Sequence, residues 1–197
     1  MERATHTLQP VVLEYVSERL VAALVQEIVA GQPLLLVSHA VVQATSKDYV
    51  RRSQERLVAQ PLLERLVAAC GSAAGAERRF VELVQGWRGR PHAEQGYGPG
   101  NVVNLLRLLR GDLRGLDLSR LAIRHAYLQG VEAQDASLAG VHLSEAVLGE
   151  AFAYPSAVAL SADGAFLVAG TPSGEVRLWR AADRTLLLAA QGHTGAV

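Results

Sequence analysis

Few residues of this chain could carry chemistry, and the clearest candidates are six histidines, one cysteine and one lysine. The lysine is Lys47, and Asp48 follows it directly. A phosphate-binding loop needs Gly-x-x-x-x-Gly-Lys followed by Ser or Thr, so no nucleotide site of that kind is predicted. The histidines lie far apart, without the paired Cys or carboxylate spacing of a metal site. They are His6, His39, His92, His125, His142 and His193. We therefore expect no catalytic residue, no cofactor and no metal ligand, and we do not expect an enzyme.

The composition limits the classes of partner that the chain could bind. The 197 residues carry 19 basic and 19 acidic side chains, and 50% of the residues are hydrophobic. Residues 1–110 have a formal charge of +3 and the remainder a charge of −3, so neither part has the strongly basic character of a nucleic-acid binder. A single cysteine, Cys70, excludes an internal disulfide. No apolar run is long enough for a membrane span, and the N-terminus lacks a signal-peptide core. We therefore expect a cytoplasmic chain with protein partners and no membrane contact.

An apolar residue returns at every fifth position between Gly111 and Ala153. On an α-helix five residues advance about 500°, which spreads such a stripe around the whole surface. On a flat strand an odd spacing sends alternate members to opposite faces. A chain that turns by a quarter every five residues points all of them to one axis. This pattern predicts a square β-solenoid with structural residues on its axis, namely Leu113, Leu118, Ile123, Leu128, Leu138, Leu143 and Leu148.

The same segment resembles the pentapeptide repeats. Their consensus is a small residue, a polar residue, Leu and two free positions, and the matching units begin at Ala126, Ala136 and Ala146. The resemblance implies a right-handed β-solenoid over residues 111–153. Eight pentads make only about two coils, roughly 10 Å tall, so both open ends need a cover. Glycines suited to the corners are Gly115, Gly130, Gly140 and Gly149.

Residues 154–197 contain four short apolar runs separated by turn signals, and they end with Gly192 and His193. The segment resembles one WD repeat, a four-stranded blade of a β-propeller, although Arg180 stands where the family usually has Asp. The resemblance implies structural roles for Asp163, Trp179 and His193. A propeller needs about four to eight blades. We therefore expect an incomplete propeller and a fragment of a longer protein, whose missing blades or neighbouring domains are partners.

The first hundred residues have helical spacing. We expect one helix from an N-cap at Thr7 to Gly31 and a second from about Ser38 to Ala59, broken or kinked at Pro61. Further helices are predicted at 62–70, 76–87 and 102–110. The run 88–100 contains Gly-Tyr-Gly-Pro-Gly and is predicted to be a loop.

Strings within this region resemble the part that follows the nucleotide-binding core of bacterial NB-ARC type signalling NTPases. They begin at Leu8, Leu36, Lys47 and Pro61, and in some members pentapeptide and WD repeats follow in the same order as here. The resemblance implies an α+β multidomain chain: a helical, winged-helix-like region at 1–88, a loop and capping helix at 89–110, the solenoid at 111–153 and the blade at 154–197.

The implied function is a non-catalytic regulatory and protein-interaction segment of a signalling NTPase, with the repeats as scaffold and sensor. The alternative is a winged-helix DNA-binding transcriptional regulator, in which four side chains face phosphates. These are Lys47, Arg51, Arg52 and Arg56. The i,i+4 spacing of Asp48 with Arg52 and of Arg51 with Glu55 favours an ordinary solvated helix face over DNA contact.

Overall fold

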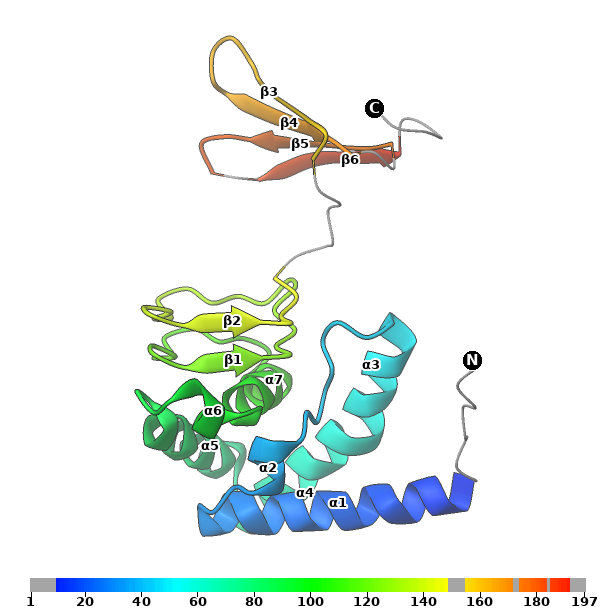
Figure 1. Ribbon diagram of the computed structural model, residues 1–197, viewed down its shortest axis with the longest axis vertical. Coiled ribbons are helices and arrows are strands. Elements are labelled where there is room, and N and C mark those ends of the chain that lie inside the picture. The colour runs from blue at the N-terminus through cyan, green and yellow to red at the C-terminus, as the bar shows by residue number, and fades with distance from the viewer. Residues whose placement is uncertain (1–9, 149–154, 172–173, 184, 192–197) are drawn as a thin grey trace. The chain divides into compact units, whose positions relative to one another are not determined.

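The computed structural model describes residues 10–148, 155–171, 174–183 and 185–191. The chain divides into two compact units, residues 1–148 and 149–197 (Figure 1). The first unit consists of helices followed by stacked coils, and the second is a small antiparallel sheet. The expected N-cap Thr7, the corner Gly149 and the terminal His193 lie outside the described residues.

Helices occupy the first unit up to Arg110. They are α1 (Pro10–Ala30), α2 (Leu35–Ser38), α3 (Asp48–Gln54), a π-helical turn η1 (Glu55–Ala59), α4 (Gln60–Cys70), α5 (Ala73–Trp87), α6 (His92–Gln95) and α7 (Gly98–Arg110). Their buried side chains form one core that continues into the coils, and Leu24, Leu66, Phe80 and Leu105 lie at its centre. Residues 10–110 contain no strand. A wing is a β-hairpin, and these described residues contain none.

One helix prediction was wrong. The helix expected from Ser38 begins only at Asp48, because the side chain of Asn101 takes up the backbone of the segment between them. It accepts a hydrogen bond from Val41 N at 2.8 Å and donates to the carbonyls of Leu36 and His39 at 2.7 Å. Of the two outcomes predicted for Pro61, a break or a kink, the structure excludes the break. The chain widens to a π-turn, in which Gln60 N donates to Glu55 O, and then continues as α4.

The loop predicted at 88–100 is partly helical. It contains α6 and the start of α7, whose first residues are Gly98, Pro99 and Gly100. Gly98 and Gly100 are buried in the first turn of α7 and do not belong to an exposed loop. A Cβ on Gly98 would lie 2.6 Å from the ring of Trp87, so the glycine allows the backbone to approach the core.

Residues 112–148 wind into coils stacked on α7. Strand β1 (Ala122–Arg124) pairs in parallel with β2 (His142–Ser144), and isolated bridges join Asp117 to Ser137 and Tyr127 to Val147. Every pair is separated by twenty residues, which equals four pentads. A backbone with positive φ returns at each fifth position, at Gly115, Arg120, His125, Gly130, Asp135, Gly140 and Glu145. Each pentad therefore has one corner in the left-handed region, where glycine has no Cβ penalty.

The second unit is a meander of four antiparallel strands, as the sequence predicted. They are β3 (Ala157–Leu160), β4 (Phe166–Gly170), β5 (Glu175–Arg180) and β6 (Leu186–Gln191), in the order β3-β4-β5-β6. The pairing of β5 with β6 shifts register between Leu178 and Trp179. Such a four-stranded sheet fits one partial blade of a β-propeller.

Candidate protein-interaction surfaces

The helices cover one end of the coils through side chains that replace a missing strand. Asn104 on α7 accepts a hydrogen bond from Tyr127 N and donates to His125 O, both at 2.8 Å. Gln95 on α6 accepts from Ala122 N at 2.7 Å and donates to Arg90 O at 2.7 Å. Both amides are fully buried. The helices thus supply hydrogen-bond partners for backbone groups on the edge of the first coil that faces them. Helices and coils therefore form one unit.

Gly100 sets the distance between α7 and the first coil. A Cβ at this position would lie 1.7 Å from the carbonyl oxygen of Arg124 at the end of β1. Only a residue without a side chain allows so close an approach. This contact holds Asn104, one turn further along α7, within hydrogen-bond distance of the coil.

A cluster of charged and aromatic side chains connects α3 and η1 to the same coil. Arg51, only 6% exposed, stacks on the ring of Tyr127 with its guanidinium carbon 3.8 Å from the ring centre. It donates to Glu55 at 3.0 Å and also to Asp48, and Glu55 accepts a second bond from Arg107. Burial alone would lower the pKa of Arg51, but the hydrogen bond that Arg51 donates to Asp48 and the charge of Glu55 raise it above its ordinary value. Arg51 therefore remains a cation within the fold.

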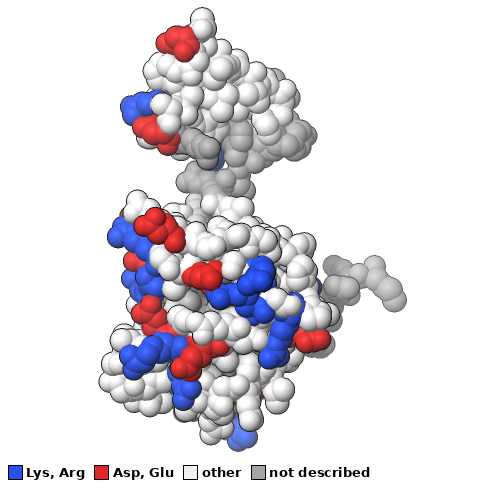
Figure 2. Space-filling view, turned by 90° about the vertical axis from the view of Figure 1, so that its left-hand side faces the viewer, with Lys and Arg blue, Asp and Glu red and all other residues white. Residues whose placement is uncertain are grey.

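This cluster bears on the DNA-binding alternative. Arg51 cannot face phosphates, because it is buried against Tyr127, and Arg52 is paired with Asp48 at 2.7 Å. Lys47 and Arg56 are exposed. Figure 2 shows basic and acidic side chains interleaved on one face of the first unit, without a field of a single sign. Arg51 is therefore not available in the alternative in which these four side chains face phosphates.

The axis residues predicted from the pentads differ in burial between the two coils. Leu113, Leu118 and Ile123 in the first coil are at most 2% exposed. Leu128 and Leu143 are partly buried, whereas Leu138 is 46% and Leu148 is 63% exposed. The first coil has α7 on one side and the second coil on the other. In the described residues the second coil is covered only by the first, so its own axis side chains are open on one side.

The sheet unit holds two of the predicted structural residues. Asp163 forms a turn between β3 and β4, where it accepts hydrogen bonds from the Ser161 hydroxyl at 2.5 Å and from Ala165 N at 3.0 Å. The bond from Ser161 is the main cause that holds the pKa of this carboxyl below its usual range. Gly164, at φ 70°, completes the turn.

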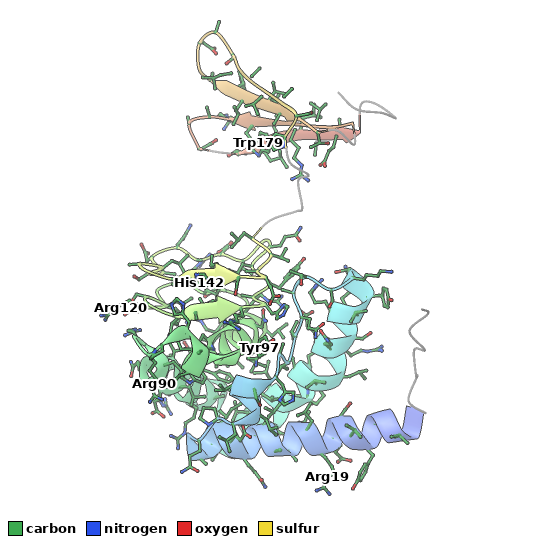
Figure 3. The ribbon with its side chains drawn as sticks, in the orientation of Figure 1. Arg19, Arg90, Tyr97, Arg120, His142 and Trp179 are labelled. Atoms are coloured by element: carbon green, nitrogen blue, oxygen red, sulfur yellow. The ribbon has the colours of Figure 1, made fainter. Side chains whose placement is uncertain are left out.

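Trp179 lies in β5, where it pairs with Leu167 of β4 and with Leu186 of β6 (Figure 3). Beside it, Arg180 forms an ion pair with Asp183 at 2.9 Å, and Asp183 also accepts from Thr185 N. The arginine that departs from the WD signature thus stabilises the turn between β5 and β6. His193, the third predicted residue of this unit, lies outside the described residues.

Both faces of the sheet expose large apolar side chains. Val158 and Leu160 on β3 are each 60% exposed. The remaining exposed apolar side chains of the sheet are Phe166, Leu186, Leu187 and Leu188. Leu160, Leu167 and Trp179 line a hollow of about 400 Å³ on the sheet. Exposed apolar surface of this kind is typical of an interaction site.

The histidines lie at structural positions in the described residues. His92 of α6 stacks on His142 of β2, with ring centres 5.0 Å apart. His125 Nε2 lies 2.9 Å from a carboxylate oxygen of Glu145, and the His125 ring stacks on Tyr97. In Figure 3, His142 lies along the same edge of the unit as Arg90 and Arg120. The described part of the chain contains no group of three His, Cys, Asp or Glu that could hold a metal ion.

The residues that join the helices to the coils were not predicted from the sequence. Asn101 and Asn104 are buried amides within an otherwise apolar run, with Val102, Val103 and Leu105 between and beside them. A buried amide must find hydrogen-bond partners, so this run carried a usable signal. Its partners could not be identified without knowing which backbone groups face α7.

Comparison with known proteins supports the interpretation of the sheet. An uncharacterized WD repeat-containing protein from Nostoc sp. (strain PCC 7120) is 34% identical to this chain over 221 aligned residues, which cover 95% of the chain. The chain spans 18% of the length of that protein. No family model matches the chain, and no solved structure matches it. The four-stranded sheet and this relative agree with a WD repeat.

Within the described ranges, none of the helices combines the length and the apolar character needed to cross a bilayer.

Proposed function

We propose that this chain is a non-catalytic protein-interaction segment of a larger signalling NTPase, in which the coils are a scaffold and the sheet is one blade of a partner-sensing propeller. The observation that carries the proposal is the sheet itself. It forms four regular strands and yet leaves Val158, Leu160 and Leu188 at least half exposed. A blade that packs between neighbouring blades needs apolar residues at such positions.

The relative supports the same proposal. Its printed name states that it contains WD repeats, and the alignment runs through almost the whole of this chain. WD propellers are built from repeated four-stranded units around a channel. The exposed apolar side chains of the sheet are the surface that further blades would cover.

The coils support a scaffold role. The twenty-residue offset and the left-handed corner in each pentad are the features that a pentapeptide-repeat solenoid requires. In such a solenoid each coil contacts only its neighbours, so the stack transmits position and does not contribute a pocket. The fixed joint to α6 and α7 would hold the stack rigidly against the helices.

Hydrogen exchange tests the blade. We expect fast exchange of the backbone amides in β3 and β6 in the 197-residue chain, and slower exchange after the addition of tandem copies of residues 156–197 that complete a propeller. The coil amide of Leu128, bonded to Val147 O at 2.7 Å, is the internal control and should be protected in both. Equal protection of β3 in both chains would contradict the proposal.

The non-catalytic part has its own test. The chain lacks the Gly-Lys-Ser/Thr grouping that holds phosphates, so we expect no binding of labelled ATP at micromolar concentration and no release of phosphate. Saturable ATP binding by the purified chain would contradict this part and leave the blade proposal standing.

A further inference from the structure

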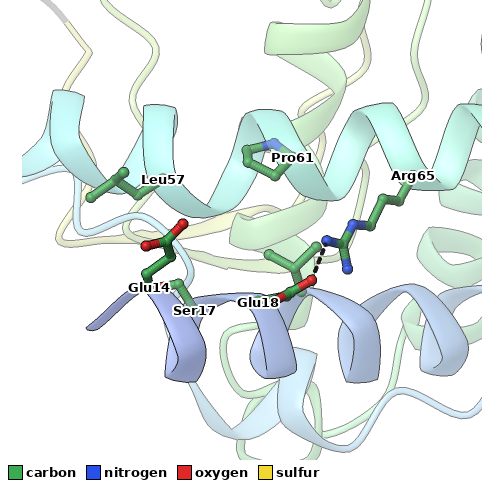
Figure 4. Close-up of a pocket in the computed structure, with 7 residues that line it drawn as sticks. Glu14, Ser17, Glu18, Leu57, Pro61 and Arg65 are labelled. Atoms are coloured by element: carbon green, nitrogen blue, oxygen red, sulfur yellow. Dashed lines mark hydrogen bonds and ion pairs between the residues drawn. The ribbon is translucent and has the colours of Figure 1, made fainter. Parts of the chain in front are cut away.

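A groove lies between α1 and the helix run formed by η1 and α4. It has a volume of about 480 Å³. Figure 4 shows Glu14, Ser17 and Glu18 of α1 on one side, facing Leu57, Pro61 and Arg65 on the other. We propose that this groove binds a basic amphipathic helix of a partner protein.

The groove exists because α1 changes character along its length. In its second half, Val21, Leu24 and Ile28 fill the core at 1% exposure or less. One and two turns earlier, the same face carries Ser17 and Glu14. These short or charged side chains do not fill the space against η1, so Leu57 remains 42% exposed on the opposite wall. The result is an apolar floor with an acidic rim.

The polar groups of the groove are mainly acceptors. Glu14 forms no ion pair with any described residue, and Glu18 already accepts from Arg65 at 3.2 Å. Pro61 has no backbone N–H, so it adds no donor to the opposite wall. Among the acidic residues that line the groove, Glu14 is therefore the one whose carboxylate has no ion pair with a described residue. A partner must supply cations, and Lys or Arg beside an apolar stripe has that chemistry.

Both walls of the groove are helices, which determines the shape of the partner. Helices have no free strand edge, so an extended peptide could not gain main-chain hydrogen bonds here. An amphipathic helix instead places apolar residues at i, i+3 or i+4 and i+7 into a groove. The floor formed by Val21, Leu57 and Pro61 offers contacts of this kind.

Fluorescence anisotropy with two synthetic peptides tests the proposal on the whole chain. The probes are helical peptides of about 18 residues with the same leucine stripe, flanked by Lys in one and by Glu in the other. We expect the Lys peptide to bind at least about tenfold more tightly than the Glu peptide. Glu14→Lys should weaken the Lys peptide about tenfold, and Leu57→Ser should weaken both peptides.

Matched control variants lie outside the groove. Glu64→Lys makes the same charge change at an exposed position of α4, and Tyr49→Ser removes an exposed apolar side chain of α3. Neither should change binding by more than about twofold. Equal affinity of the two peptides, or no effect of Glu14→Lys, would overturn the proposal. Self-association that Leu57→Ser abolishes would also overturn it, because the occupant would then be a second copy of this chain.

Discussion

Replacing Gly100 by alanine should separate α7 from the first coil. The new Cβ would lie 1.7 Å from the carbonyl oxygen of Arg124, whereas ordinary van der Waals contact begins at 3.4 Å. The obstacle is backbone on both sides, so no flexible side chain can move away. The helix and β1 must therefore move apart by more than about 1.5 Å, which a close-packed interior resists.

The loss of stability comes from the hydrogen bonds that this movement breaks. Asn104 forms two hydrogen bonds of 2.8 Å with the backbone of His125 and Tyr127, and the same displacement carries both beyond 3.5 Å. A buried polar group that loses its partner costs about 1–3 kcal/mol. Alanine returns about 1 kcal/mol through its better helix propensity. We expect a net loss of about 3 kcal/mol in the free energy of unfolding.

Urea unfolding followed by circular dichroism measures this loss. The control is Gly86→Ala in α5, where a Cβ would meet no atom within 4 Å. This control should leave stability unchanged or raise it by up to about 1 kcal/mol. If Gly100→Ala unfolds at the same urea concentration as the unmodified chain, the close contact between α7 and β1 does not hold the unit together.

Three further predictions concern Leu118, Arg51 and Asp163. Leu118→Asp should lower the free energy of unfolding by several kcal/mol, because the Leu118 side chain is only 2% exposed. Leu138 lies one coil later and is 46% exposed, so Leu138→Asp should cost under about 1 kcal/mol when both variants are unfolded in urea. Arg51→Ala should cost about 3 kcal/mol and its exposed neighbour Arg52→Ala under about 0.5 kcal/mol, and equal midpoints would contradict the buried cluster. Asp163 has a lowered folded pKa, so its stabilisation should be complete above about pH 4 and be lost as pH falls through the folded pKa. Asp163→Asn should remove that acid-dependent part of the exchange protection in the sheet.

The sheet was predictable because its signals are local. Each turn carries its own residues, such as Asp163 with Gly164, and strands between tight turns have only one antiparallel order that avoids crossovers. The alternation of short apolar runs therefore determined both the number of strands and their order. No local signal identifies the surface that covers the faces of the sheet. The sequence could only indicate that Val158 and Leu160 need a cover.

The helical region was less predictable because its backbone conformation depends on distant side chains. The segment before α3 has helical spacing, but Asn101 binds its peptide groups from sixty or more positions away. The glycines of 96–100 resemble a loop in sequence, since the contacts that require Gly98 and Gly100 come from Trp87 and Arg124. Local propensity fails where a tertiary hydrogen bond or a close approach determines the backbone.

The joint between helices and coils answers a general problem of repeat structures. A coil at the end of a stack has unpaired N–H and C=O groups along its edge, and a covering helix cannot pair with them, because its own backbone groups are used internally. Carboxamide side chains solve this, since each offers a donor and an acceptor. Asn104 binds two peptide groups of the edge, and Gln95 binds one while it holds α6 to Arg90. The hydrogen bonds of these buried amides are therefore what allows the helices to end against the first of the stacked coils.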